Sequence, residues 1–182
     1  MTSARGLARW RARLAEALAR KRVPLGYLLA IVAFWLAAPT PLSLAIGATV
    51  GAIGEAFRIW AAGHLEKGRE VTSSGPYALT RHPLYVGSSI MGAGLAIAAH
   101  SAVVAVMVGL YLAVTITAAI SSEEAHLTDK FGGDYPAYRS GAAAPAARRF
   151  SLERALRNRE YRALAGLVLV LALLAVKCYM LL

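Results

Sequence analysis

The sequence predicts an all-α integral membrane protein with about five transmembrane helices. Of the 182 residues, 58% are hydrophobic and only 16% are charged, which lies outside the usual range of soluble domains. Long apolar runs alternate with polar stretches, and the arginines flank the apolar runs. The length indicates a single domain covering residues 1–182.

The net charge of +10 raises the question of a nucleic-acid partner. Because the arginines border apolar runs, anionic lipid headgroups of a bilayer explain the charge better, and we expect no nucleic acid to bind. Cys178 is the only cysteine, which excludes an intramolecular disulfide and a multi-cysteine metal site. We expect no metal ion.

Residues 1–22 carry leucines and a tryptophan on one helical stripe and arginines on the opposite face. This pattern is typical of a basic amphipathic helix at a membrane surface. An ordinary solvated helix packed on the rest of the protein fits the pattern as well.

The first two apolar runs, 23–38 and 42–62, predict two spans joined by a tight uncharged turn. Gly47, Gly51 and Gly54 share one face of the second run, so another helix can pack closely there.

Glu55 and Arg58 lie one turn apart in the last third of this second run. Charges inside a membrane usually face the bundle interior and often mark a pathway or a site. Two interpretations stay open: a functional site, or a mutual ion pair at the cytosolic edge.

Residues 85–99 and 102–120 predict a third and a fourth span around a minimal turn. The fourth helix should continue to about Lys130, because the Phe131-Gly132-Gly133 run is a typical glycine stop. Asp134 is the expected N-cap of a short helix that carries Tyr135 and Tyr138.

The segment 139–163 is a basic connection, in which Ser151 should cap a helix that runs through Arg162. The last apolar run, 164–182, predicts a C-terminal transmembrane helix. The core with the polar motifs therefore covers 23–138.

Lysine and arginine residues number seven in 1–22, three in 63–83 and eight in 121–163, whereas the connections around Pro39 and His100 carry none. The positive-inside rule then places the N-terminus and the polar stretches in the cytoplasm, as expected of a protein in a bacterial inner membrane.

Two polar stretches on this cytosolic side suggest a cofactor pocket. The first, 63–87, holds a Gly75-Pro76-Tyr77 turn and a helix start near His82-Pro83, where free backbone N–H groups favour an anion. The second holds Glu123 and Glu124. A ligand with a carboxylate at one end and a cationic centre with an amine at the other would match, and S-adenosylmethionine is such a ligand.

The same residues carry a resemblance. The Arg81–Gly87 run reads R-H-P-x-Y-x-G, and the Glu123–Tyr138 run reads E-E-x-x-L-x-x-x-F-G-x-x-Y-x-x-Y. Both patterns resemble the signatures of the isoprenylcysteine carboxyl methyltransferase and phospholipid methyltransferase superfamily, in the same order and separated by one apolar hairpin. The resemblance covers about residues 58–138.

The resemblance implies a small integral membrane enzyme that transfers a methyl group from S-adenosylmethionine to a lipidic or membrane-soluble acceptor. Together with the charges beside the helix start, it gives the expected cofactor-binding residues: His64, Val71, Thr72, Tyr77, Arg81, His82, Pro83, Leu84, Tyr85, Glu123 and Glu124. The catalytic group is not indicated, and the candidates are His64, Glu55 and Arg58.

Ala119 departs from the family pattern, because the eukaryotic prenylcysteine enzymes have a substrate-contacting arginine there. The chain therefore resembles the broad bacterial branch more than those enzymes. Two alternatives remain. Sterol and steroid reductases of the membrane carry a related R-H-P-x-Y motif and use NADPH, but usually have Asn at the position of Leu84. A non-catalytic membrane protein of the same fold is the other.

Overall fold

The computed structural model describes residues 26–141 and 148–181. The amphipathic helix expected in 1–22 lies outside the described residues. Within the described ranges the chain consists of helices and turns, with no strand. The all-α prediction is therefore confirmed for this part of the chain.

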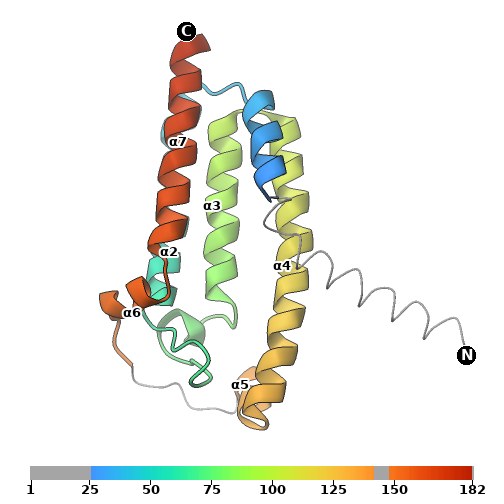
Figure 1. The fold of residues 1–182 in the computed structure, drawn as a ribbon, viewed down its shortest axis with the longest axis vertical. Coiled ribbons are helices and arrows are strands. Elements are labelled where there is room, and N and C mark those ends of the chain that lie inside the picture. The colour runs from blue at the N-terminus through green and yellow to red at the C-terminus, as the bar shows by residue number, and fades with distance from the viewer. Residues whose placement is uncertain (1–25, 142–147, 182) are drawn as a thin grey trace, which may run out of the picture.

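Five apolar helices form a bundle whose axes run roughly along one direction (Figure 1). They are Gly26–Leu36, α2 (Pro41–Ala62), α3 (Pro83–Ala99), α4 (Ala102–Phe131) and α7 (Tyr161–Leu181). Of these, α2, α4 and α7 are long and apolar enough to cross a membrane, so the chain is a membrane protein. The helix Gly26–Leu36 and α3 are shorter than the roughly 20 residues that a bilayer usually needs.

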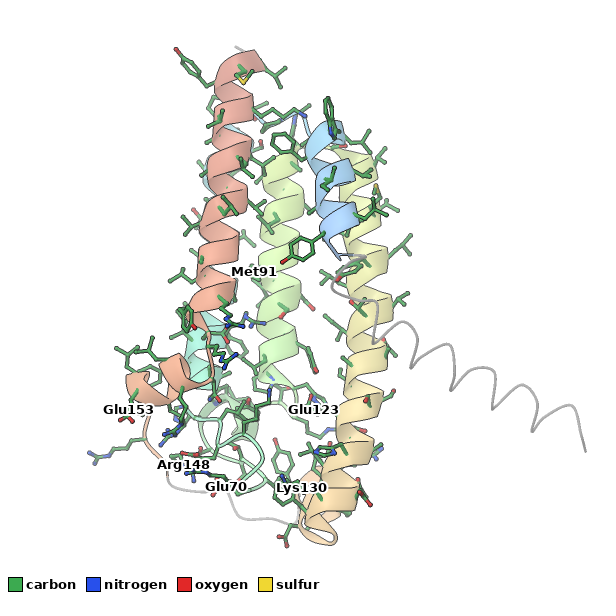
Figure 2. All side chains as sticks on the ribbon, in the orientation of Figure 1. Glu70, Met91, Glu123, Lys130, Arg148 and Glu153 are labelled. Atoms are coloured by element: carbon green, nitrogen blue, oxygen red, sulfur yellow. The ribbon has the colours of Figure 1, made fainter. Side chains whose placement is uncertain are left out.

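Short helices occupy one end of the bundle: the 3-10 turn η1 (Gly75–Ala78), α5 (Asp134–Arg139) and α6 (Leu152–Arg157). Figure 2 shows Glu70, Glu123, Lys130, Arg148 and Glu153 gathered at this same end, which we call the polar end. The two polar stretches that the sequence singled out lie at this end.

Glycines bring α2 and α3 into close contact, as the sequence predicted for Gly47 and Gly54. A Cβ on Gly54 would lie 2.5 Å from the Met91 backbone N and 2.8 Å from the Gly87 carbonyl. A Cβ on Gly47 would lie 2.5 Å from the Gly94 carbonyl. Gly51 instead leaves room for Leu167 of α7, at 3.1 Å. These close approaches make α2 and α3 the centre of the bundle.

Local chemistry explains where the helices begin and end. α2 begins with a capping box, in which the Thr40 side chain accepts a hydrogen bond from the Ser43 backbone N–H at 3.1 Å. α3 begins at Pro83, as predicted. α4 runs to Phe131 and stops at Gly132, whose φ of 52° suits glycine, again as predicted. Asp134 is the first residue of α5 rather than its cap, which is Gly133.

One predicted helix is divided in two. Ser151 caps α6, since its side chain accepts a hydrogen bond from the Arg154 backbone N–H at 3.3 Å. However, α6 ends at Arg157 rather than Arg162, and α7 begins at Tyr161 rather than Leu164. The prediction of a helix through Arg162 was wrong because Arg159 adopts a positive φ of 62°, which breaks the helix.

Candidate functional site

The two polar stretches that the sequence singled out meet at the polar end. The His82 ring Nε2 lies 3.1 Å from Glu124 Oε1, and Arg81 NH1 donates to the same oxygen at 3.1 Å. His82 directly precedes α3, and Glu124 lies on the part of α4 that extends past its apolar run. The α3–α4 hairpin therefore joins residues more than 40 positions apart.

A cavity of about 760 Å³ opens beside this contact. Such a volume falls in the usual range of small-molecule sites. It is lined by ten of the candidates named from the sequence: Arg58, Val71, Thr72, Tyr77, Arg81, His82, Pro83, Leu84, Tyr85 and Glu123. Glu124, His64 and Glu55 are outside this lining.

Glu123 and Glu124 have different surroundings although they are neighbours. Glu124 is held by His82 and Arg81, and Arg139 NH1 lies 3.7 Å from its other oxygen. Glu123 lines the cavity, its side chain is 45% exposed, and its ion-pair contact to His82 Nδ1 spans 4.0 Å. Glu124 therefore holds Arg81, His82 and Arg139 together, whereas Glu123 is the less engaged of the two carboxylates.

Tyrosines form a second part of the wall. The Tyr138 hydroxyl donates to the Tyr77 carbonyl at 2.6 Å, which ties α5 to the η1 turn. Tyr135 lines the cavity and is only 2% exposed, and its hydroxyl interacts with the Glu124 carboxylate. Burial raises the pKa of Tyr135 to about 12, so the hydroxyl keeps its proton at neutral pH. A hydroxyl has one donor hydrogen and two acceptor lone pairs, so this one can also take part in binding a ligand.

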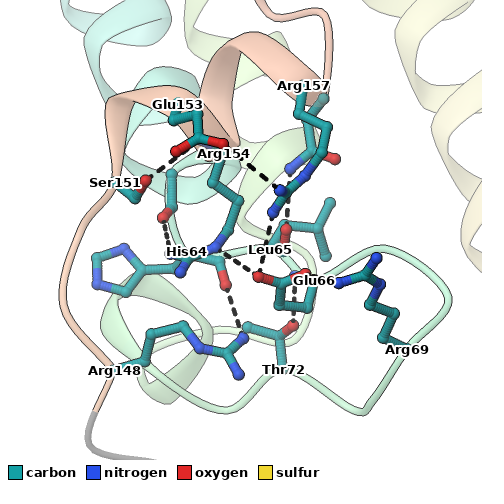
Figure 3. A network of polar contacts seen from close by, with 12 residues as sticks. His64, Leu65, Glu66, Arg69, Thr72, Arg148, Ser151, Glu153, Arg154 and Arg157 are labelled. Carbon is teal, nitrogen blue, oxygen red and sulfur yellow. Dashed lines mark hydrogen bonds and ion pairs between the residues drawn. The ribbon is translucent and has the colours of Figure 1, made fainter.

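The loop between α2 and η1 supplies the opposite wall, including Glu66, Val71 and Thr72. The Glu66 backbone N–H donates to the Thr72 hydroxyl at 3.2 Å, which closes the loop on itself. Arg154 of α6 donates to the Glu66 carboxylate at 2.8 Å, and Arg157 does so at 3.3 Å (Figure 3). The hydrogen bond from Arg154 holds the pKa of Glu66 below its usual range.

His64 packs on the outer side of the η1 turn. Its ring Nδ1 lies 3.1 Å from the Trp60 carbonyl, and its ring packs near Phe150. Gly75 has a φ of 57°, and a Cβ there would come within 2.7 Å of the His64 ring. His64 thus shapes the turn that carries Tyr77, and Gly75 is required by both its backbone conformation and this close contact.

Arg58 and Glu55 lie in the last third of α2, next to the polar end. Their contacts differ from the mutual ion pair that the sequence analysis considered. Arg58 Nε donates to Glu160 Oε1 at 2.6 Å, whereas Glu55 Oε2 is 3.6 Å away. Arg58 NH1 donates to the Leu84 carbonyl at 3.3 Å and also to the Ser88 hydroxyl. Glu55 is 2% exposed, and neither of its carboxyl oxygens has a hydrogen-bond partner among the described residues.

Metal-ligating side chains do not gather in the described ranges. No three His, Cys, Asp or Glu residues there are arranged to hold a metal ion.

The comparison with protein families shows the family of this chain. The model of the family described as phospholipid methyltransferase matches residues 22–134, which is more than half of the chain. The chain belongs to the phospholipid methyltransferase family. The match ends before α6 and α7, so the C-terminal part that contacts Arg58 and Glu66 lies beyond it.

Two curated relatives are similar to this chain. The nickel-cobalt-cadmium resistance protein NccN of Alcaligenes xylosoxydans xylosoxydans is 32% identical over 99 residues, which are 53% of this chain and 45% of the relative. The cobalt-zinc-cadmium resistance protein CzcN of Cupriavidus metallidurans is 32% identical over 94 residues, 50% of this chain and 44% of the relative. The chain thus spans less than half the length of each. No solved structure matches significantly.

Several residues of the site escaped the sequence analysis. Glu160 lies 102 positions from its partner Arg58, and no local pattern connects the two. The cavity-lining Glu66 reads as an ordinary loop carboxylate. Tyr135 was named from the sequence only as a residue of the Glu123–Tyr138 motif. Its position just after the glycine stop was the one sequence feature that pointed to it.

Proposed function

We propose that the protein is a membrane methyltransferase that uses S-adenosylmethionine, held in the cavity at the polar end. The observation that carries this proposal is the convergence of both family motifs on one cavity of about 760 Å³. The residues present fit the cofactor, since the wall offers a carboxylate, cationic groups and a buried tyrosine hydroxyl.

Glu123 would bind the amino group of the cofactor, because it faces the cavity with only one long contact of its own. Arg81 and Lys130 supply cationic groups in the same wall for the carboxylate. Tyr77 and Tyr135 offer aromatic surface and, in Tyr135, a hydrogen-bonding group. Glu124 acts indirectly by holding His82 and Arg81.

When bound, S-adenosylmethionine supplies an electrophilic methyl group on a sulfonium. The chain would contribute mainly by holding the two reactants in line and excluding water, which is worth roughly 7–11 kcal/mol in well-oriented reactions. A carboxylate acceptor needs no base, whereas an ammonium or thiol must first lose a proton. Among the candidate catalytic residues, Arg58 lines the cavity, whereas His64 and Glu55 do not.

The acceptor would be a lipid or another membrane-soluble molecule, because the cavity extends to Leu84, Tyr85 and Ala119 where α3 and α4 enter the apolar part of the bundle. The distribution of lysine and arginine favours a cytosolic position of the polar end. The cofactor would then enter from the cytosol, in a bacterial inner membrane.

Calorimetry on the detergent-solubilised protein tests the cofactor. We expect S-adenosylmethionine to bind in the micromolar range, about −8 kcal/mol at 1 μM, and NADPH to give no signal. Binding of NADPH without binding of S-adenosylmethionine would support the membrane reductase instead.

Labelled S-adenosylmethionine tests the activity. The purified protein is incubated with it and with a lipid extract of the host, and labelled products are separated and identified. We expect a labelled lipidic product. Cofactor binding without any labelled product would favour a non-catalytic member of the fold.

A second candidate function, tolerance to metal ions, is favoured by the names of the two relatives. Growth of a host that expresses the chain, in medium with cobalt or cadmium, tests it. We expect any protection to disappear in a variant that cannot bind S-adenosylmethionine. Protection that survives in such a variant would contradict a role through methylation.

A further inference from the structure

Arg58 lines the cavity, and only part of its guanidinium forms hydrogen bonds. Its Nε donates to Glu160, and its NH1 donates to the Leu84 carbonyl and the Ser88 hydroxyl. Its NH2 makes no hydrogen bond to any residue in the part of the chain that the structure describes. Since arginine carries five donor hydrogens in a rigid fork, the NH2 edge remains able to donate to a bound molecule.

Glu160 is well placed to orient this guanidinium. It is 6% exposed, and its Oε1 lies 2.6 Å from Arg58 Nε. The turn that carries it is attached to the end of α2, because the Asn158 side-chain amide donates to the Ala62 and Leu65 carbonyls, both at 2.9 Å. A buried carboxylate on an anchored turn restricts the rotamers that its partner can adopt.

Glu55 is a second carboxylate close to the Arg58 guanidinium. Its Oε2 is 3.6 Å from Arg58 Nε, on the same helix, and it lies outside the lining of the cavity. Without the charge of Glu160, Arg58 would be attracted toward Glu55, and only the two hydrogen bonds of its NH1 to Leu84 and Ser88 would oppose a turn of the guanidinium away from the cavity. Glu160 therefore contributes to the direction in which Arg58 points.

We propose that Glu160 is a positioning residue which holds Arg58 in the cavity wall, and that the Arg58 NH2 edge binds a hydrogen-bond-accepting oxygen in the polar head of the methyl acceptor. The inference rests on the proposed function and names the acceptor end of that site. Glu160 lies outside the residues that match the family model, so this part of the site comes from the C-terminal segment of this chain.

Methyl transfer with titrated host lipid extract tests the role of both residues. We expect Arg58→Gln to raise the half-saturating amount of extract about tenfold and Glu160→Gln to raise it severalfold, while the half-saturating concentration of S-adenosylmethionine changes less than twofold. Glu160→Asp should restore most of the loss. Glu160→Gln should add nothing to Arg58→Gln, since residues that act through one another are not additive.

The matched control is Glu153→Gln, which removes the same charge from the same segment. The Glu153 side chain is 89% exposed, and its ion-pair contact to Arg157 spans 4.0 Å. We expect the control to behave like the parent. Equal effects of Glu153→Gln and Glu160→Gln, or a Glu160→Gln effect confined to S-adenosylmethionine, would overturn the proposal.

A second measurement does not depend on activity. A cysteine introduced at Ala119 in the cavity wall, in a Cys178→Ser background, is labelled with anionic and with cationic methanethiosulfonate reagents. Glu160→Gln should lower the anionic-to-cationic rate ratio severalfold, because Arg58 then turns toward Glu55 and its positive charge leaves the cavity wall. A raised ratio would reflect only the lost charge of Glu160 and would overturn the positioning role. Glu153→Gln should leave the ratio unchanged, and Arg58→Gln should abolish the Glu160 effect.

The two measurements separate the two proposals. A parent protein that transfers no methyl group overturns the proposed function and with it the acceptor role of Arg58, while the labelling ratio still decides whether Glu160 controls Arg58. An unchanged ratio in Glu160→Gln overturns the positioning role, even if methyl transfer is observed.

Discussion

Glu123 and Glu124 show how two adjacent carboxylates can take separate roles. Neighbouring helical residues point about 100° apart, so the two side chains meet different surroundings. The structure places Glu123 in the cavity wall and Glu124 among Arg81, His82 and Arg139. Glu123→Gln should therefore weaken S-adenosylmethionine binding about ten- to a hundredfold, the loss of a charge-assisted hydrogen bond worth about 1.5–3 kcal/mol.

Glu124→Gln is the matched comparison for this prediction. It should lower the melting temperature by removing the charge that holds His82 and Arg81, with a smaller effect on the cofactor. Calorimetry and thermal unfolding of both variants check the assignment. Parental affinity in Glu123→Gln would show that this carboxylate is not a cofactor ligand.

Glu66 gives the loop a pH-dependent attachment. Its pKa is lowered in the folded protein because Arg154 donates to its carboxylate. The stabilisation is therefore fully present above the ordinary pKa of glutamate and is lost as the pH falls through the lowered folded value. Parent and Glu66→Gln should differ in melting temperature at pH 7, and the difference should shrink as the pH falls toward 3. A difference that grows on acidification would contradict the ion pair.

At the scale of elements, the α2–α3 contact depends on the absence of side chains. Gly54→Ala would place a Cβ 2.5 Å from the Met91 backbone N, so the helices must separate. We expect a loss of about 1–3 kcal/mol in stability, as for other overpacked cores. Gly109→Ala on α4 is the control, since nothing lies within 4 Å of its Cβ position. Thermal unfolding of both variants in detergent measures the contrast, and equal melting temperatures would argue against tight α2–α3 packing.

The ends of a helix could be predicted from the sequence where interactions between neighbouring residues define them. The start of α3 at Pro83 and the end of α4 before Gly132 depend on local chemistry, and the sequence predicted both. The break between α6 and α7 depends on Asn158 reaching carbonyls 93 and 96 positions away. No local pattern signals such contacts, so the sequence predicted that the basic helix continues to Arg162.

The same division holds for the candidate site in the whole molecule. The meeting of His82 with Glu124 was predictable, because an apolar hairpin must return the chain to the side of the membrane where it began. The pairing of Arg58 with Glu160 was not, since it requires the C-terminal helix to pack against α2. Helix length adds information that the apolar runs alone do not give. α3 has 17 residues and is therefore about 26 Å long at 1.5 Å per residue, slightly shorter than the bilayer core of about 30 Å.

The topology of the whole chain is the last testable expectation. Eight lysine and arginine residues lie in 121–163, and none lie in the turns around Pro39 and His100. Reporters fused after Arg149 should therefore read cytosolic, and reporters after Leu182 should read external. At the opposite end of the bundle Lys177 donates to the Phe34 and Trp35 carbonyls, at 2.5 and 3.0 Å, so its charge caps the end of the helix Gly26–Leu36.

Lys177 shows how a cation is accommodated at the end of the bundle that the charge rule predicts to be external. Its ammonium donates hydrogen bonds to two carbonyls at the end of a helix, which stabilise the charge at this position. Lys177→Met should therefore keep the external reading of the C-terminal reporter. If the parent itself placed the reporter after Leu182 in the cytosol, α7 would lie on the membrane or re-enter it, and the five-helix topology would be wrong.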